Sequence, residues 1–116
     1  MAFERYLGQR MALKGPKAAI WAQGIIVFNG AAIGKWKLTD SRFAVLFYDR
    51  EKKRIGVKFT NDPKEAGART FRQRKHDGTI FAKAFFGHYG IDYSKAVRFD
   101  IEFDEKNGLY ILTEEG

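Results

Sequence analysis

Apolar residues occur in short runs along this chain, and their spacing predicts strands more often than helices. Residues 43–48 are apolar at every position, which is typical of a strand that is covered on both faces. After a charged turn at 49–53, Ile55, Val57 and Phe59 alternate with charged or small residues, the period-two pattern of a half-buried strand. These two runs predict a β-hairpin.

The same reasoning predicts six further strands and two short helices. In the first part of the chain we expect strands at 18–22 and 25–28 and a helix at 30–37, with the Asn29 side chain capping the helix. In the second part we expect strands at 70–75, 79–81, 97–103 and 109–112, and a helix at 82–89.

The order of elements in residues 17–60 recurs in residues 69–113, on either side of a polar linker at 61–68. At an offset of 53 residues, Phe28 coincides with Phe81 and Thr60 with Thr113. The repetition predicts an α+β fold in a single domain of residues 1–116. In it, two similar β-β-α-β-β halves pack with pseudo-two-fold symmetry after an N-terminal segment at 1–16. The alternative is a plain α+β domain whose internal similarity is coincidental.

Composition narrows the class of protein. The chain has 116 residues, 45% of them hydrophobic and 11 of them phenylalanine, which is enough for one packed core. It has no cysteine, so disulfides, thiolate nucleophiles and thiolate metal sites are excluded. No apolar run approaches the about 20 residues of a membrane-spanning helix. We therefore expect a cytoplasmic protein with no membrane partner.

The charge is positive and unevenly distributed. The formal net charge is +7, with 18 lysines and arginines against 7 acidic residues in 1–91 and 3 against 7 in 92–116. A basic body with an acidic end favours a polyanionic partner and electrostatic steering towards it. The competing interpretation is that the basic side chains serve solubility alone.

A family resemblance follows from residues 24–29 (Gly-Ile-Ile-Val-Phe-Asn), the short helix after them and Trp36-Lys-Leu38. This order resembles the core of AbrB-like swapped-hairpin DNA-binding proteins, and residues 89–91 (Tyr-Gly-Ile) resemble its closing motif. The resemblance implies two paired units that bind duplex DNA through basic side chains. However, Ile25 and Thr79 stand where the family has arginine, so its usual DNA contacts do not carry over. The chain also resembles small prokaryotic and phage proteins without an established activity.

The strongest candidate for a binding surface is the segment 69–76 (Arg-Thr-Phe-Arg-Gln-Arg-Lys-His). In a strand, Arg72 and Arg74 face the same way about 7 Å apart, near the phosphate spacing of a nucleic-acid strand. Exposed aromatic side chains nearby would favour single-stranded partners, although Phe71 is more typical of a core. The predicted contacts to nucleic acid are Arg69, Arg72, Arg74, Lys75, Lys53 and Arg54. Alternatively, these charges protect a sheet edge or pair with Asp100 and Glu102.

Enzymatic chemistry finds little support. The chain has no P-loop and no nucleophile elbow, and His76 and His88 lack the spacing of metal ligands. Asp100 and Glu102 lie beside Arg98 on one expected strand and are typical of solvated carboxylates. We therefore expect a protein without catalytic residues, cofactor, metal or small-molecule substrate.

Two functions of different classes remain. The leading hypothesis is a nucleic-acid-binding protein, with DNA and RNA both open. The alternative is a protein-interaction or homodimeric assembly module in which aromatic residues such as Trp36 form the contact face. Phosphate contacts weaken steeply with salt whereas an apolar dimer face does not, so salt dependence separates the two.

Overall fold

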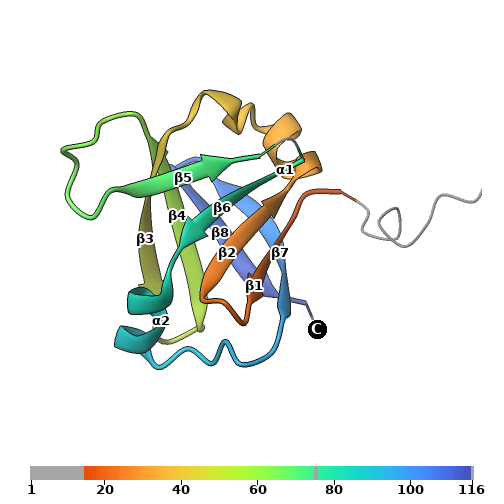
Figure 1. Cartoon of the computed structure of the whole chain (residues 1–116), viewed down its shortest axis with the longest axis vertical. Coiled ribbons are helices and arrows are strands. Elements are labelled where there is room, and N and C mark those ends of the chain that lie inside the picture. Colours follow the sequence, from red (N-terminus) through yellow and green to blue (C-terminus); the bar gives the residue numbers. More distant parts are fainter. Residues whose placement is uncertain (1–14, 75, 116) are drawn as a thin grey trace, which may run out of the picture.

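The computed structural model describes residues 15–74 and 76–115, and its strands form one closed antiparallel barrel (Figure 1). The order around the barrel is β1-β2-β6-β5-β3-β4-β8-β7, and β7 pairs with β1 to close it. The strands are β1 (Lys17–Trp21), β2 (Ile25–Asn29), β3 (Phe43–Asp49), β4 (Arg54–Thr60), β5 (Arg69–Gln73), β6 (Asp77–Phe81), β7 (Val97–Asp104) and β8 (Leu109–Glu114). The helices are α1 (Gly30–Lys35), the short 3₁₀ helix η2 (Leu38–Asp40) and α2 (Lys83–Tyr89).

The individual strands and helices predicted from the sequence are confirmed, with ends that differ by no more than two residues. Asn29 caps α1 as expected, since its Oδ1 accepts a hydrogen bond of 2.9 Å from the backbone N–H of Ala32. The sequence did not predict η2, a single turn whose Leu38 is buried. Local sequence patterns therefore locate the strands and the two α-helices to within two residues, but not η2.

The predicted arrangement of these elements is wrong. The protein is a β-barrel and not an α+β fold, and no two β-β-α-β-β halves pack on each other as units. Four strand pairs, β1–β7, β2–β6, β3–β5 and β4–β8, join the first half of the chain to the second. Hydrogen bonding across the halves uses the strand edges that separate units would leave free. The helices, of 6, 3 and 7 residues, are too short to form a layer over a sheet.

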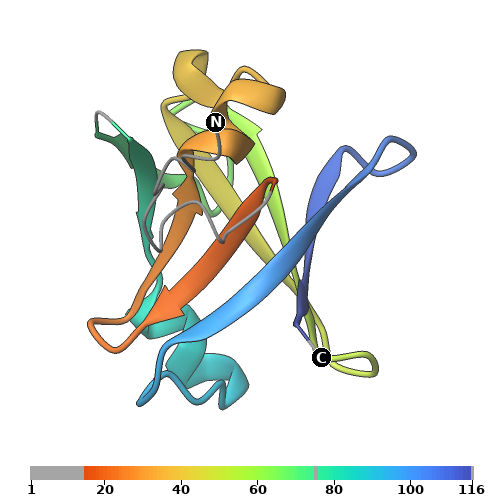
Figure 2. The ribbon, with the colours of Figure 1, turned by 90° about the vertical axis from the view of Figure 1, so that its right-hand side faces the viewer.

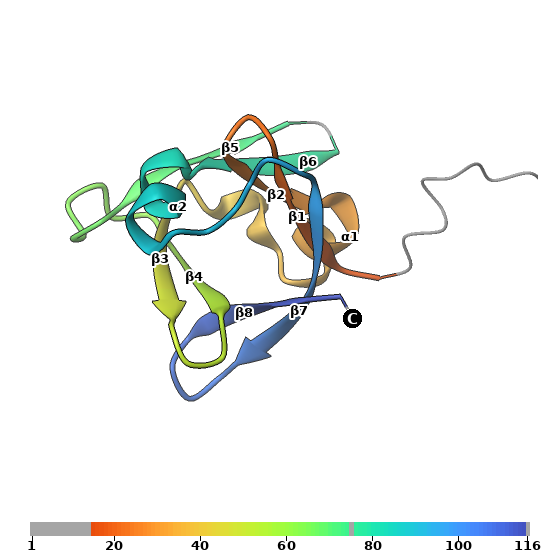
Figure 3. The same cartoon turned by 90° about the horizontal axis from the view of Figure 1, so that it is seen from below.

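Alternate side chains of the strands fill the barrel. Phe28, Phe59 and Phe71 pack together in the core, with ring centroids 4.7 to 6.2 Å apart. The two α-helices lie at opposite ends of the barrel (Figure 1). Figure 3 looks onto the end that carries α2, and Figure 2 shows the β7–β8 hairpin extending along one side. The two ends of the barrel are therefore covered by different helices, α1 at one end and α2 at the other.

The hairpin turns after β3 and β7 are held by an aspartate in the same way. Asp49 Oδ1 accepts hydrogen bonds from the backbone N–H groups of Glu51 and Lys52 at 3.1 and 3.2 Å. Asp104 Oδ1 accepts one from the backbone N–H of Lys106 at 3.1 Å. Both turns therefore use a negatively charged side chain to satisfy backbone donors.

Replacing Gly78 of β6 with alanine should destabilise the barrel. An alanine Cβ would lie 2.3 Å from Phe71 Cζ, so the central aromatic ring would have to move. We expect a loss of about 1–3 kcal/mol in the free energy of unfolding, as for other overpacked cores, measured by urea denaturation. Gly87→Ala in α2 is the matched control, because nothing lies within 4 Å of its added Cβ. The control should be neutral or stabilising, and equal losses in both variants would contradict this packing.

The two capping aspartates should make stability depend on acid pH. The backbone N–H of Lys52 lowers the pKa of Asp49, with help from Arg54, and the Asn107 side chain lowers that of Asp104. A lowered folded-state pKa means that the stabilisation is present above the ordinary pKa of aspartate and is lost as pH falls through the folded value.

The corresponding measurement is the melting temperature between about pH 5 and pH 2. It should fall less steeply in the double variant Asp49→Asn/Asp104→Asn than in the wild type, because asparagine still accepts the backbone hydrogen bonds but does not titrate there. An identical fall in both proteins would show that these turns carry none of the acid dependence.

Candidate functional site

The structure distributes the sequence-predicted basic residues over different parts of the barrel. Arg69 and Arg72 lie on β5, and Arg74 lies in the following turn, where its backbone N–H donates to the carbonyl of Asp77 at 2.8 Å. That turn is at the α1 end, because a Cβ on Gly30 would lie 3.1 Å from the His76 carbonyl oxygen. Lys75 lies outside the described residues.

Lys53 and Arg54 are at the other end. Lys53 ends the β3–β4 turn and Arg54 begins β4, and Lys53 lines a cavity together with Tyr89 of α2. Arg54 forms an ion pair of 3.2 Å with Asp49 of the same hairpin. The six predicted contacts therefore do not form one continuous surface, and only Arg69 and Arg72 stay together on one strand.

The outer wall around these two arginines carries exposed aromatic side chains. Phe71 faces the core and is 3% exposed, so the neighbouring Arg72 faces outward. The strand register places Trp21, Ile25 and Phe81 in one row across β1, β2 and β6. Trp21 is 42% exposed and Phe81 is 53% exposed. This row is an apolar platform on the outside of the barrel.

A second row runs beside the first and ends in an arginine on each side. Arg98, Ala19, Val27, Thr79 and Arg72 are consecutive partners across β7, β1, β2, β6 and β5. Between the two arginines lie the small or apolar residues Ala19, Val27 and Thr79, of which Val27 and Thr79 are 7% and 5% exposed, so the accessible part of the wall is mainly the first row. We call the two rows together with Arg69 the aromatic face.

Two arginines are held against the same aromatic residue. The guanidinium carbon of Arg72 lies 5.5 Å from the centroid of the Phe81 ring, within the range of a cation–π interaction. Arg69 Nη1 donates a hydrogen bond of 3.0 Å to the Phe81 carbonyl oxygen. Among the ion pairs of residues 15–74 and 76–115, none involves Arg69, Arg72 or Arg98. Their charges are therefore available to a ligand at the edges of the platform.

Asp100, one of the two acidic residues considered from the sequence as partners for these arginines, pairs with a lysine instead. Asp100 pairs with Lys17, and Glu115 lies 3.3 Å from the same ammonium group. The hydrogen bond from Lys17 to Asp100 is the main cause that raises the Lys17 pKa. Among the ion pairs of the described residues, neither Asp100 nor Glu102 pairs with a β5 arginine, and β5 is not a neighbour of β7, so the pairing considered from the sequence is wrong.

The sequence analysis missed Trp21 and Phe81, the two most informative side chains of the aromatic face. Strand alternation could have identified Phe81, because it follows the fully buried Ile80 and must point the other way in a strand. The aromatic residue named instead, Trp36, packs edge-on against Tyr110 with ring centroids 5.1 Å apart. It lies directly after α1, at the other end of the barrel from α2.

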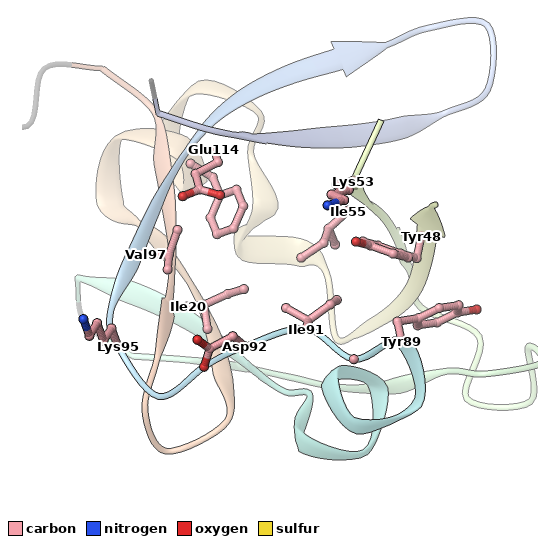
Figure 4. A pocket seen from close by; sticks show the side chains of 12 residues that line it. Ile20, Tyr48, Lys53, Ile55, Tyr89, Ile91, Asp92, Lys95, Val97 and Glu114 are labelled. Carbon is pink, nitrogen blue, oxygen red and sulfur yellow. The ribbon is translucent and has the colours of Figure 1, made fainter. Parts of the chain in front are cut away.

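A cavity of about 430 Å³ opens at the α2 end of the barrel (Figure 4). Ile20, Ile55 and Phe99 form its apolar floor, and Tyr48 and Tyr89 form an aromatic side. Charged groups stand around it: Lys53, Lys95, Asp92 and Glu114.

Lys53 has an unusual backbone conformation in the turn beside this cavity. Its φ is +53°, in the left-handed region that costs an L-amino acid roughly 1–2 kcal/mol and glycine nothing. The corresponding position of the β7–β8 turn, four residues after Asp104, is Gly108 with φ +66°. The same turn geometry is therefore built once with glycine and once, at a cost, with lysine.

Other kinds of site find no support in the part of the chain that the structure describes. No group of three histidine, aspartate or glutamate side chains there could hold a metal ion. No helix among these residues is both long and apolar enough to cross a membrane. The His88 ring packs edge-on against Tyr89, with centroids 4.7 Å apart.

Comparison with known proteins adds no relative: no protein-family model, no curated protein and no solved structure matches this chain. The likeness to AbrB-like proteins therefore stays an expectation from the sequence.

Lys53→Gly should stabilise the protein. Glycine relieves the left-handed conformation, partly offset by its greater freedom in the unfolded chain, so the free energy of unfolding should rise by about 0.5–1 kcal/mol. The control is Lys52→Gly, which removes the same charge from an adjacent exposed position without positive φ. The control should lose stability in the same urea denaturation experiment. A loss in Lys53→Gly as well would mean that the lysine side chain stabilises the turn.

Proposed function

We propose that this protein binds single-stranded nucleic acid on its aromatic face. The observation that carries the proposal is the exposed row of Trp21 and Phe81, with the Arg72 guanidinium seated over the Phe81 ring. Aromatic rings on a sheet surface give bases a stacking platform, and flanking arginines can contact the phosphates. The net charge of +7 favours the approach of such a polyanion.

The spacing of the platform suits unpaired bases. Trp21 and Phe81 lie two strands apart, roughly 10 Å given the ordinary separation of β-strands, with Ile25 between them. Each ring can therefore take a base of its own, while the strand between them crosses the apolar Ile25 side chain. Base stacking of this kind tolerates sequence differences because every base has a π-face.

The exposed rings favour a single strand over a duplex. A duplex keeps its bases stacked inside and offers phosphates and groove edges, so it would leave Trp21 and Phe81 uncovered. The duplex binding implied by the AbrB-like resemblance would depend on basic side chains alone. An assembly module could also use the apolar row, with a second copy of the chain covering it, and the experiment below separates this alternative.

Titration of fluorescently labelled single- and double-stranded DNA and RNA, read by fluorescence anisotropy at two salt concentrations, tests the proposal. We expect single strands to bind more tightly than duplex. Phe81→Ala should weaken binding about 5- to 150-fold, because one stacking contact is worth about 1–3 kcal/mol. Arg72→Ala should weaken binding and reduce the salt slope by roughly 0.7, the loss of one phosphate contact to a single strand.

Two exposed residues away from the aromatic face serve as controls. Phe47 on β3 is 43% exposed and matches Phe81, and Arg50 in the β3–β4 turn matches Arg72. Phe47→Ala and Arg50→Ala should bind like the wild type. The proposal would be contradicted if the control variants lost binding as much as Phe81→Ala and Arg72→Ala. It would also be contradicted if the protein bound no nucleic acid at low salt and instead formed a salt-insensitive dimer that Phe81→Ala dissociates.

A further inference from the structure

The cavity at the α2 end of the barrel has the features of a small-molecule site. Its volume of about 430 Å³ lies within the ordinary range of ligand pockets. We propose that it binds a small molecule with an apolar body and one anionic group, and that the Lys53 ammonium holds the anionic group. This proposal does not depend on nucleic-acid binding at the aromatic face.

The floor of the cavity fits an apolar body. Ile20 and Ile55 are 1% and 2% exposed and Phe99 is 5% exposed, so the barrel core continues directly into the floor. On one side, Tyr48 and Tyr89 lie with ring centroids 4.9 Å apart, and the Arg50 guanidinium covers the Tyr89 ring at 4.9 Å. A flat or flexible apolar group can therefore lie over aliphatic side chains beside an aromatic wall.

The charges around the cavity are arranged asymmetrically. Figure 4 shows Lys53 beside Ile55 on the side of Tyr48, with Asp92, Lys95 and Glu114 across the cavity. Asp92 accepts a hydrogen bond of 2.9 Å from the backbone N–H of Ser94, and its pKa is lowered by this bond and, more weakly, by Lys95. Among the ion pairs of the described residues, none involves Lys53. A ligand anion on the Tyr48 side would therefore meet a lysine without a carboxylate partner.

The backbone of Lys53 supplies an independent observation. Lys53 and Lys37, the residue before η2, are the two non-glycine residues with positive φ in the part of the chain that the structure describes. Of the two, Lys53 is the one that lines this cavity, and it is the costly conformation beside a cavity that points to a use for the side chain. The β7–β8 turn of this protein does use glycine, at Gly108, and its turn does not line this cavity. The lysine that replaces glycine is the one whose side chain reaches the cavity. Anion binding at this position accounts for both facts.

The proposal gives Lys53 a role different from the nucleic-acid contact expected from the sequence. Lys53 lies at the cavity and is not part of the aromatic face, whose residues come from β1, β2, β5, β6 and β7. A compound without phosphate can therefore test the cavity without engaging the proposed nucleic-acid surface.

The experiment is an NMR titration of ¹⁵N-labelled full-length protein with 4-phenylbutyrate, and in parallel with 4-phenylbutan-1-ol as its uncharged counterpart. We expect saturable shifts at the backbone amides of Tyr48, Tyr89, Gly90 and Ile91. The carboxylate should bind about tenfold or more tightly than the alcohol, as a charge-assisted contact predicts.

Lys53→Gly is the decisive variant, and Lys52→Gly is its control for charge on the same turn. Lys53→Gly should weaken 4-phenylbutyrate binding about tenfold while leaving the alcohol unchanged, with its amide spectrum showing that it stays folded. Lys52→Gly should bind like the wild type. Absence of saturable shifts at the cavity, equal binding of acid and alcohol, or unchanged binding in Lys53→Gly would each overturn the proposal.

Discussion

Closure of the barrel is the constraint on which the other features of this structure depend. Pairing of β7 with β1, from Lys17 opposite Asp100 to Ile20 opposite Val97, leaves every strand with a neighbour on both sides. In a closed barrel each strand must alternate between a side chain in the core and one on the outside. Burying one residue of a strand therefore exposes its neighbour. The buried and exposed neighbours are Phe71 and Arg72 on β5, Ile80 and Phe81 on β6, and Ile20 and Trp21 on β1.

The same closure brings the aromatic face and the cavity to neighbouring parts of one barrel end. The β1–β2 turn sits on the start of α2, because the Ala82 backbone N–H donates to the Gly24 carbonyl oxygen at 2.9 Å. A Cβ on Gly24, whose φ is +84°, would lie 2.9 Å from Lys83 Cβ, so only glycine permits this approach. Trp21 and Phe81 lie outside this junction, whereas Ile20 lies inside it on the cavity floor. One strand, β1, thus contributes adjacent residues to both proposed sites.

The sequence determines the elements of this protein much better than their arrangement. Alternation at Ile55, Val57 and Phe59 and the cap at Asn29 are local signals, and both are confirmed. The α+β prediction failed because it let strands pair only within their own half of the chain. The pairs β2–β6 and β4–β8 join residues about 50 positions apart, and no local pattern encodes such contacts.

For the candidate sites too, the sequence identifies individual residues better than their arrangement in space. Arg72 was identified as an outward-facing residue from strand alternation, but its place over the Phe81 ring depends on the β5–β6 register. Lys53 was identified as a basic residue at a hairpin tip. Its left-handed backbone belongs to the turn itself, as at Gly108, whereas its place at the cavity depends on how that hairpin meets α2, which the sequence alone does not specify.

The central claim is that single-stranded nucleic acid lies on the aromatic face. Its most direct test is to follow the backbone amides of ¹⁵N-labelled protein during titration with a short single-stranded oligonucleotide. We expect the largest shifts at Trp21, Ile25, Arg72 and Phe81, with little change on β4 and β8 across the barrel. Shifts centred on β4 and β8, or spread evenly over all lysines and arginines, would contradict it.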